Sequence, residues 1–118
     1  MAFYWHKHLP MVIALLKINP RPETRKDVLE ILRFLRGPLG ARQDCLACEI
    51  YEAHDSEGEI LYLEQWRSME ALSRHIQSSL YMRVLTAMEL AARAPEICFH
   101  EVADSRGMDL IEALRGGQ

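Results

Sequence analysis

The sequence predicts an α+β fold, the ferredoxin-like split β-α-β-β-α-β arrangement with one antiparallel sheet and helices on one of its faces. Three observations predict it. The first is a short apolar run rich in Val and Ile near the start of the chain. The second is a pair of amphipathic segments, and the third is a set of further strand-like runs. In chain order the six segments span 11–18, 23–36, 45–53, 59–66, 68–93 and 96–103.

The composition is that of an ordinary globular domain. The chain has 118 residues, and its net charge of -3 predicts neither a nucleic-acid nor a membrane partner. No apolar run approaches the ~20 residues of a membrane helix. The first ten residues lack the basic start of a signal peptide, so we expect a cytoplasmic protein with three free thiols. We divide the chain into an N-terminal arm (1–10), one domain (11–103) and a C-terminal tail with a short helix (104–118).

The first half of the predicted fold is a buried strand followed by a helix. The run 11–18 is apolar at nearly every position, as in a central strand buried on both faces. Prolines at 20 and 22 end this strand. The helix 23–36 carries one apolar stripe, and we expect Gly37-Pro38 to end it and 39–44 to be a loop. The stripe consists of Val28, Ile31, Leu32 and Leu35.

The second half begins with a hairpin and continues with two helices. The strands 45–53 and 59–66 flank a polar loop that contains a glycine. Ser68 is an N-cap for a helix to about Gln77, and Ser78 or Ser79 is expected to cap a longer helix to about Arg93. A strand over 96–103 and a short amphipathic helix over 107–115 complete the chain.

The sheet is predicted to be apolar on both faces, although helices cover only one. Along the hairpin, apolar side chains occur at successive positions rather than alternating with polar ones; examples are Leu46, Ala47 and Cys48, and Leu61, Tyr62 and Leu63. A face that met water would be polar. We therefore predict a homodimer in which a second copy covers the open face, sheet against sheet.

The pattern Glu64-x-Trp66-x-Ser68-x-x-Ala71-Leu72-x-x-His75-x-x-Ser78 resembles the antibiotic biosynthesis monooxygenase domain family. The resemblance extends over residues 11–103. It implies that two sheets pair into a dimeric α+β barrel. The family includes cofactor-free oxygenases, quinol oxidases, haem-degrading enzymes and members without a known reaction, so the fold does not select the chemistry. Haem-degrading members carry tryptophan at the position of His75 and their haem ligand at the position of Leu85, which cannot ligate iron.

Two residues are predicted to be catalytic. His75 lies on the same helical face as Leu72 and titrates near neutral pH, which suits it to carry a proton. Trp66 closes a strand, and its ring would form the wall of a pocket for a flat aromatic substrate. The alternatives are a histidine hydrogen-bonded to backbone and a tryptophan that only packs the core.

Four further residues are predicted to bind substrate: Asn19, Tyr62, Glu64 and Tyr81. Glu64 should share a strand face with Tyr62 and Trp66 and needs a partner, for which Arg83 or Arg67 would serve. Asn19 is alternatively a turn residue before Pro20. The two tyrosines are alternatively core residues.

Neither a cofactor nor a metal is predicted. Glycine-rich phosphate loops and zinc-spaced ligand sets are absent from the sequence. Cys45 and Cys48 have redox-motif spacing, but within a regular strand they would face opposite ways, so core packing is favoured. His6 and His8 lack an acidic or thiol companion for a metal, and an arm packed on a dimer is favoured.

Two functions follow from these predictions. The first is a cofactor-independent monooxygenase or quinol oxidase acting with O2 on a polycyclic phenol or hydroquinone, with His75 as the proton carrier. The alternative is a non-enzymatic homodimer that binds a small apolar molecule or serves in a stress response. The helix 107–115 would either fold over the pocket or clasp the partner subunit.

Overall fold

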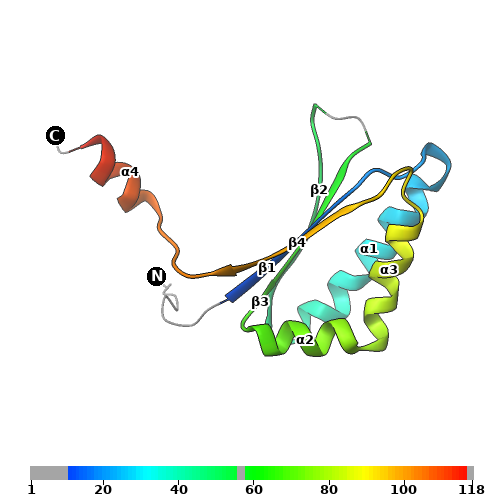
Figure 1. The fold of residues 1–118 in the computed structure, drawn as a ribbon, viewed down its shortest axis with the longest axis horizontal. Coiled ribbons are helices and arrows are strands. Elements are labelled where there is room, and N and C mark those ends of the chain that lie inside the picture. The colour runs from blue at the N-terminus through cyan, green and yellow to red at the C-terminus, as the bar shows by residue number, and fades with distance from the viewer. Residues whose placement is uncertain (1–10, 56–57, 117–118) are drawn as a thin grey trace.

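The computed structural model of the protein describes residues 11–55 and 58–116. The N-terminal arm, with His6 and His8, therefore lies outside the described residues. Four antiparallel strands form one sheet in the order β2-β3-β1-β4: β1 (Met11–Ile18), β2 (Cys45–Glu52), β3 (Ile60–Trp66) and β4 (Glu96–Val102). Three helices cover one face of it (Figure 1): α1 (Arg25–Gly40), α2 (Met69–Gln77) and α3 (Met82–Glu89). The predicted ferredoxin-like order is confirmed.

The core lies between this sheet and the helices because the two inner strands alternate strictly. The even-numbered residues of β1, Val12 to Ile18, are buried toward the helices, whereas the odd-numbered ones are half-buried or exposed on the open face. In β3 the helix-facing residues are Ile60, Tyr62, Glu64 and Trp66, all buried. The sheet thus presents one face to its own helices and an apolar, partly exposed face to the outside.

Helix α1 is longer than predicted. Gly37-Pro38 does not end it, because the helix continues to Gly40 and the predicted loop begins only at Ala41. Proline removes one N–H from the helical ladder, but it falls in the last turn, where little helix remains to disrupt. Leu39 is fully buried and extends the apolar stripe by one turn, so packing outweighs the proline.

The predicted cap of α2 is confirmed, and the predicted helix after it is present but shorter. The Ser68 side chain accepts a hydrogen bond from the Ala71 N–H at 3.1 Å, and α2 ends at Gln77 as predicted. A single 3-10 turn, η2 (Ser79–Tyr81), follows, and α3 ends at Glu89 rather than near Arg93. The Ser78 hydroxyl does not cap this turn; it donates to the His75 carbonyl at 2.6 Å.

The reason for the early end of α3 is a contact with the start of α1. The Thr24 hydroxyl donates to the Leu90 carbonyl at 2.9 Å, and the Ala92 N–H donates to the Asn19 carbonyl at 2.7 Å. These backbone groups hydrogen-bond to the segment after β1 instead of within a helix, so α3 ends before them. A second 3-10 turn, η1 (Pro22–Thr24), starts this region.

A bulge in β2 corrects the predicted orientation of the two neighbouring cysteines. Cys45 pairs with Trp66 and Cys48 pairs with Glu64, and the register shifts between Cys45 and Ala47. An extra residue in one strand reverses the alternation beyond it. Both cysteines therefore lie on the helix-facing side, and the prediction that they face opposite ways is wrong. All three cysteines of the chain are free.

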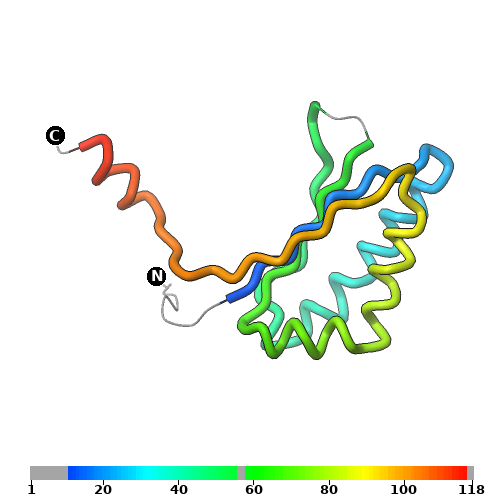
Figure 2. Tube along the Cα trace, viewed as in Figure 1, coloured from blue at the N-terminus to red at the C-terminus, as the bar shows by residue number. Residues whose placement is uncertain are grey.

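The last helix, α4 (Met108–Arg115), lies apart from the rest of the fold. Figure 2 shows that the chain continues from β4 away from the helical layer before α4 begins. The radius of gyration is 16.4 Å, against about 13–14 Å for a compact chain of this length. None of the residues of α4 is buried, although Met108, Ile111 and Leu114 are apolar. Helix α4 therefore does not cover the other helices of this chain.

Candidate functional site

The centre of the candidate site is the carboxylate of Glu64, in the middle of the sheet. Its neighbours across the strands are Ala14 on β1 and Cys48 on β2, two small side chains that leave room on the helix-facing side. Glu64 is only 2% exposed. A buried carboxylate needs hydrogen-bond donors in place of water, and three side chains supply them.

Each donor to Glu64 comes from a position that strand or helix periodicity fixes. The Tyr62 hydroxyl donates to Oε2 at 2.7 Å, and the Trp66 indole Nε1–H donates to Oε1 at 3.0 Å. Both residues are two positions from Glu64 in β3, so they share its face. The third contact joins Oε2 to Nε2 of His75 at 3.2 Å. The carboxylate is thus enclosed by aromatic donors.

His75 is held in place by its helix and by two aromatic rings. It lies two turns after the Ser68 cap and shares the buried face of α2 with Ala71 and Leu72. Its ring stacks on Trp66 with centroids 4.7 Å apart, and it meets the Tyr81 ring edge-on at 5.2 Å. The side chain is fully buried, and its Nδ1 has no protein hydrogen-bond partner.

The surroundings of Glu64 shift the pKa values of the acids around it. Burial opposes ionisation of Glu64, but hydrogen bonds from His75, Tyr62 and Trp66 and the attraction of His75 outweigh it and hold the pKa below its usual value. Burial and the Glu64 charge raise the pKa of Tyr62 and of Tyr81. At neutral pH the site therefore holds one carboxylate and two protonated phenols.

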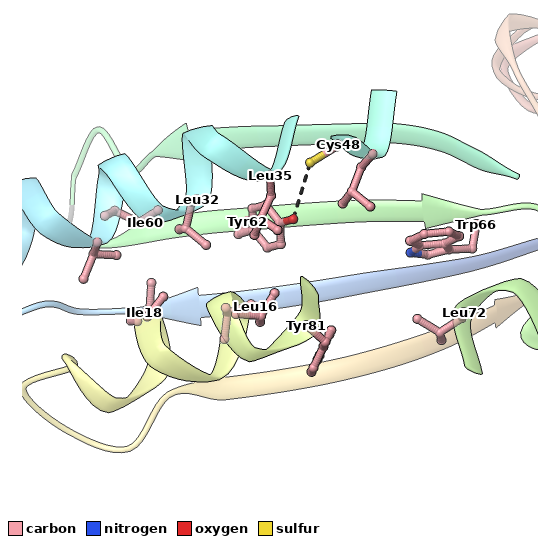
Figure 3. Close-up of a cluster of buried hydrophobic side chains, with 14 of the residues drawn as sticks. Leu16, Ile18, Leu32, Leu35, Cys48, Ile60, Tyr62, Trp66, Leu72 and Tyr81 are labelled. Atoms are coloured by element: carbon pink, nitrogen blue, oxygen red, sulfur yellow. Dashed lines mark hydrogen bonds between the residues drawn. The ribbon is translucent and has the colours of Figure 1, made fainter. Parts of the chain in front are cut away.

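The cysteines of β2 adjoin the same network but are not activated. The Cys48 thiol of β2 lies 3.4 Å from the Tyr62 hydroxyl of β3, and Figure 3 shows this contact with Trp66 further along β3. Burial raises the pKa of Cys48, and burial together with Cys48 and Glu64 raises the pKa of Cys45 to about 12. A nucleophilic cysteine needs the opposite shift, so both thiols act as packing groups here.

A charged group closes the end of the site next to Trp66. The Arg42 guanidinium makes two 3.0 Å hydrogen bonds to Asp44 and lies 5.2 Å from the centroid of the Trp66 ring. Arg74 of α2 reaches the same carboxylate at 3.4 Å. The hydrogen bond from Arg42 is the main reason that the pKa of Asp44 lies below its usual value. The sequence analysis missed Arg42 and Asp44, which lie in the segment predicted as a loop.

Five of the six predicted site residues lie together. His75, Trp66, Tyr62, Glu64 and Tyr81 form the contacts described above. Asn19 does not join them: it follows β1 five residues after Ala14, the partner of Glu64, which is roughly 16 Å along a strand. The Asn19 carbonyl accepts a hydrogen bond from the Ala92 N–H instead.

The predicted arginine partners of Glu64 are wrong. The Arg83 guanidinium lies over the Phe34 ring at 4.0 Å, on the outer surface of the helices. Arg67 donates to the Gln43 carbonyl at 3.1 Å. Arg67 follows directly after the last, helix-facing residue of β3, and Arg83 precedes the buried Val84 of α3. The carboxylate is satisfied by neutral and histidine donors instead.

Within 11–55 and 58–116, no three His, Cys, Asp or Glu side chains lie close enough together to hold a metal ion. Among the helices of the same residues, none has the length and apolarity to cross a membrane.

Comparison with known proteins places the chain in a family. The sequence model of the antibiotic biosynthesis monooxygenase family matches residues 11–86, more than half of the chain. The chain belongs to this family. The match includes every residue of the Glu64 network, from Arg42 to Tyr81.

Two individual relatives are similar to this chain over much of its length. Rv0793 of Mycobacterium tuberculosis, named as a candidate monooxygenase, is 31% identical over 71 residues, which are 60% of this chain and 69% of that protein. An uncharacterised Synechocystis protein, sll1783, is 24% identical over 98 residues, 82% of this chain and 66% of its own length. The chain therefore spans about two thirds of each of these relatives.

Solved structures share the fold. The structure of Rv0793 superposes with a TM-score of 0.73 at 26% identity, over 82% of this chain and 99% of that chain. A conserved protein of Methanosarcina mazei Go1 gives 0.72 at 17% identity, over 80% and 94% of the two chains. The second likeness concerns the fold alone.

Proposed function

We propose that the protein is a cofactor-independent monooxygenase or quinol oxidase that acts with O2 on a polycyclic phenol or hydroquinone. The observation that carries the proposal is the fully buried His75, hydrogen-bonded to a buried carboxylate and stacked on Trp66. Membership of a family named for monooxygenases supports it. The network offers a proton acceptor and aromatic walls, which are the parts that such a reaction requires of a protein.

The substrate itself supplies the electrons. A phenolic O–H gives its proton to His75, and the resulting ring anion transfers an electron to O2. The two radicals combine at a ring carbon that carries one hydrogen, and the peroxide anion takes the proton back from His75 to give a hydroperoxide. Loss of water then leaves a quinone carbonyl: one oxygen atom enters the product, and the other leaves as water with the hydrogen of that carbon and the returned proton. For a hydroquinone, two electrons and two protons pass to O2 instead, giving the quinone and hydrogen peroxide.

The roles of the residues follow from their positions. His75 accepts the substrate proton and Glu64 positions its ring through the 3.2 Å contact. The rings of Trp66, Tyr62 and Tyr81 exclude water from the reacting groups. Arg42 and Asp44 cover the outer edge of Trp66. Asn19 is left out of the proposed site because of its distance along β1.

The working form is proposed to be a cytoplasmic homodimer with the two open sheet faces in contact. The face consists of half-buried apolar residues flanked by few charges, including Ile13, Leu15, Leu61 and Leu63. A surface of this kind is more apolar than the solvated face of an antiparallel sheet. A second copy would cover it with the same residues in a two-fold pair.

Oxygen uptake tests the enzymatic function. The purified protein is mixed with naphtho- and anthra-hydroquinones, and uptake is compared with autoxidation in buffer. We expect uptake well above the buffer rate that falls in His75→Ala and in Trp66→Phe. The matched control is His54→Ala, which changes an exposed histidine at the hairpin loop. Background uptake by a folded dimer across the panel would refute the function.

One observation favours the non-enzymatic alternative. His75 and Trp66 are both fully buried in the described chain, as they would be if the network only stabilised a module that binds an apolar molecule. Such a protein would bind the same aromatic compounds without consuming oxygen. Quenching of tryptophan fluorescence by a quinone, together with background oxygen uptake, would identify it.

A further inference from the structure

The Glu64 network leaves one atom of His75 unused. Among the residues that the structure describes, Nδ1 of His75 is the buried side-chain nitrogen or oxygen without a protein hydrogen-bond partner. All the other polar atoms of the network are paired: both oxygens of Glu64, the Tyr62 hydroxyl, the Trp66 indole N–H and Nε2 of His75. Buried polar atoms are rarely left unpaired, so this one needs an explanation.

The partner of the opposite nitrogen fixes where the imidazole proton lies. An ionised carboxylate only accepts hydrogen bonds, so the 3.2 Å contact between Nε2 and Glu64 requires a hydrogen on Nε2. The carboxylate is ionised because the donors Tyr62 and Trp66 already point at it. A neutral imidazole has one hydrogen, and with that hydrogen on Nε2 the free lone pair is on Nδ1.

We infer that Glu64 fixes His75 as the Nε2–H tautomer, so that Nδ1 is the proton acceptor of the site and binds the acidic O–H of a phenol, hydroquinone or enol. This inference rests on the proposed function for its ligand, and on the hydrogen bonds alone for the tautomer. Glu64 is a positioning residue and His75 is the group that touches substrate. The arrangement follows the general carboxylate–histidine logic, in which a buried acid holds one ring nitrogen and frees the other.

The neutral form fits the burial of the ring better than the charged form. An imidazolium would place a second N–H at Nδ1, where no acceptor faces it, and an orphaned buried donor is costlier than an orphaned acceptor. The titratable groups that face the ring are Glu64 and Tyr62 of β3 and Tyr81 of η2. Among these three groups Glu64 is the charged one, and it also accepts hydrogen bonds from Tyr62 and Trp66.

The geometry also selects the chemical class of the ligand. The two ring nitrogens point to nearly opposite sides of an imidazole, so a ligand reaches Nδ1 from the side away from Glu64. Trp66 stacks on the ring and Tyr81 packs against it at about a right angle. His75 is not exposed and the adjacent Tyr81 is 7% exposed, so the route to Nδ1 that the proposal assumes passes Tyr81. A quinone carries only hydrogen-bond acceptors, and Nδ1 of this tautomer is also an acceptor. A quinone should therefore bind less well than its hydroquinone.

Glu64→Gln provides a specific test because the amide can replace each hydrogen bond only with the other tautomer. Its oxygen can take the place of Oε1 and accept from Trp66. Its NH2 group then takes the place of Oε2, between Tyr62 and His75. An NH2 group donates to Nε2 of His75, which moves the imidazole hydrogen to Nδ1. The variant should keep its fold and lose its acceptor.

The decisive measurement is the tautomer of His75 in the full-length protein without substrate. Histidine is labelled with 15N, and long-range proton–nitrogen spectra are recorded near pH 7.5, with His75→Gln identifying the signals among the five histidines. We expect a pyrrole-like Nε2 and a pyridine-like Nδ1 in the wild type, and the reverse in Glu64→Gln. Glu52→Gln, which changes an exposed ion pair with Arg25, is the control and should leave the signals unchanged.

Two results would overturn the inference. One is a wild-type His75 that carries its hydrogen on Nδ1, and the other is a His75 protonated at both nitrogens at this pH. The wild-type spectrum decides this even where Glu64→Gln fails to fold. Where the enzyme consumes oxygen, Glu64→Gln should lower turnover by on the order of 10²-fold or more, with a smaller change in KM. The predicted tautomer in a protein without oxygen uptake would refute the oxygenase function and support the tautomer.

Discussion

Replacing Glu64 with leucine measures what the buried network contributes to folding. Leucine has a similar size and cannot accept a hydrogen bond. It leaves the Trp66 N–H, the Tyr62 hydroxyl and the His75 N–H without their acceptor. The Tyr62 hydroxyl can still turn to the Cys48 sulfur, 3.4 Å away. Two donors therefore remain stranded in the core.

The magnitude follows from these two donors. A buried donor without an acceptor costs about 1–3 kcal/mol, which gives a gross loss of about 2–6 kcal/mol. Removing a buried carboxylate recovers part of its desolvation penalty. We therefore expect Glu64→Leu to lower the free energy of unfolding by about 2–4 kcal/mol, a large share of the ~5–15 kcal/mol of an ordinary domain. Glu64→Gln keeps an acceptor for the Trp66 N–H but moves the His75 hydrogen to Nδ1, which has no partner; with one stranded donor it should cost about 1–3 kcal/mol.

Urea unfolding at a fixed protein concentration measures both variants, since a dimer would make stability concentration-dependent. Tyr62→Phe is the companion variant, because it removes one donor and leaves only the weak thiol donor of Cys48 without a partner. It should cost about 1 kcal/mol. A Glu64→Leu protein as stable as the wild type, with an unchanged denaturant slope, would refute the view that Trp66 and His75 depend on this carboxylate.

Three further predictions concern acid stability, packing and assembly. The folded-state pKa of Glu64 lies below its ordinary value of 4.5, so below that pH the unfolded chain binds more protons than the folded one. The free energy of unfolding should therefore fall with decreasing pH more steeply in the wild type than in Glu64→Gln. Urea titrations at several acid pH values measure this, and equal pH dependence of the two proteins would contradict it. Leu39→Ala should cost about 2–5 kcal/mol in urea unfolding because the side chain is fully buried, and the exposed Leu46→Ala should cost far less; equal losses would count against the extended α1. Leu15→Arg on the open sheet face should give a monomer by light scattering, whereas Phe34→Arg on the helical surface should not; a dimer that survives Leu15→Arg would exclude the sheet-to-sheet pair.

The alternation of strands was the most reliable guide that the sequence offered. A period of two places Tyr62, Glu64 and Trp66 on one face whatever the surroundings, and the structure confirms this. The Ser68 cap then fixes the rotation of α2, which brings His75 to the same space. Local rules sufficed for these residues because each position depends on near neighbours in the chain.

The predictions that failed concern residues whose positions do not depend on near neighbours alone. The bulge at Leu46 adds one residue to β2, and nothing in the local pattern marks it. The prediction that Cys45 and Cys48 face opposite ways was therefore wrong. Pro38 is a strong helix-breaking signal that was outweighed by the burial of Leu39 against the sheet. Both outcomes depend on packing between distant segments, which propensity does not contain.

The wrong partner predicted for Glu64 shows how a buried charge is accommodated in this fold. Opposite charge suggested Arg83 or Arg67, yet the carboxylate is met by two neutral donors and a histidine. A guanidinium in the same place would neutralise Glu64 and leave the imidazole free to adopt either tautomer. Neutral donors leave the negative charge in place, and in the proposed mechanism that charge both holds the hydrogen on Nε2 and stabilises the imidazolium that forms when Nδ1 accepts a proton. The arrangement fits the proposed proton transfer, whereas stability alone would be served as well by an apolar side chain with apolar neighbours.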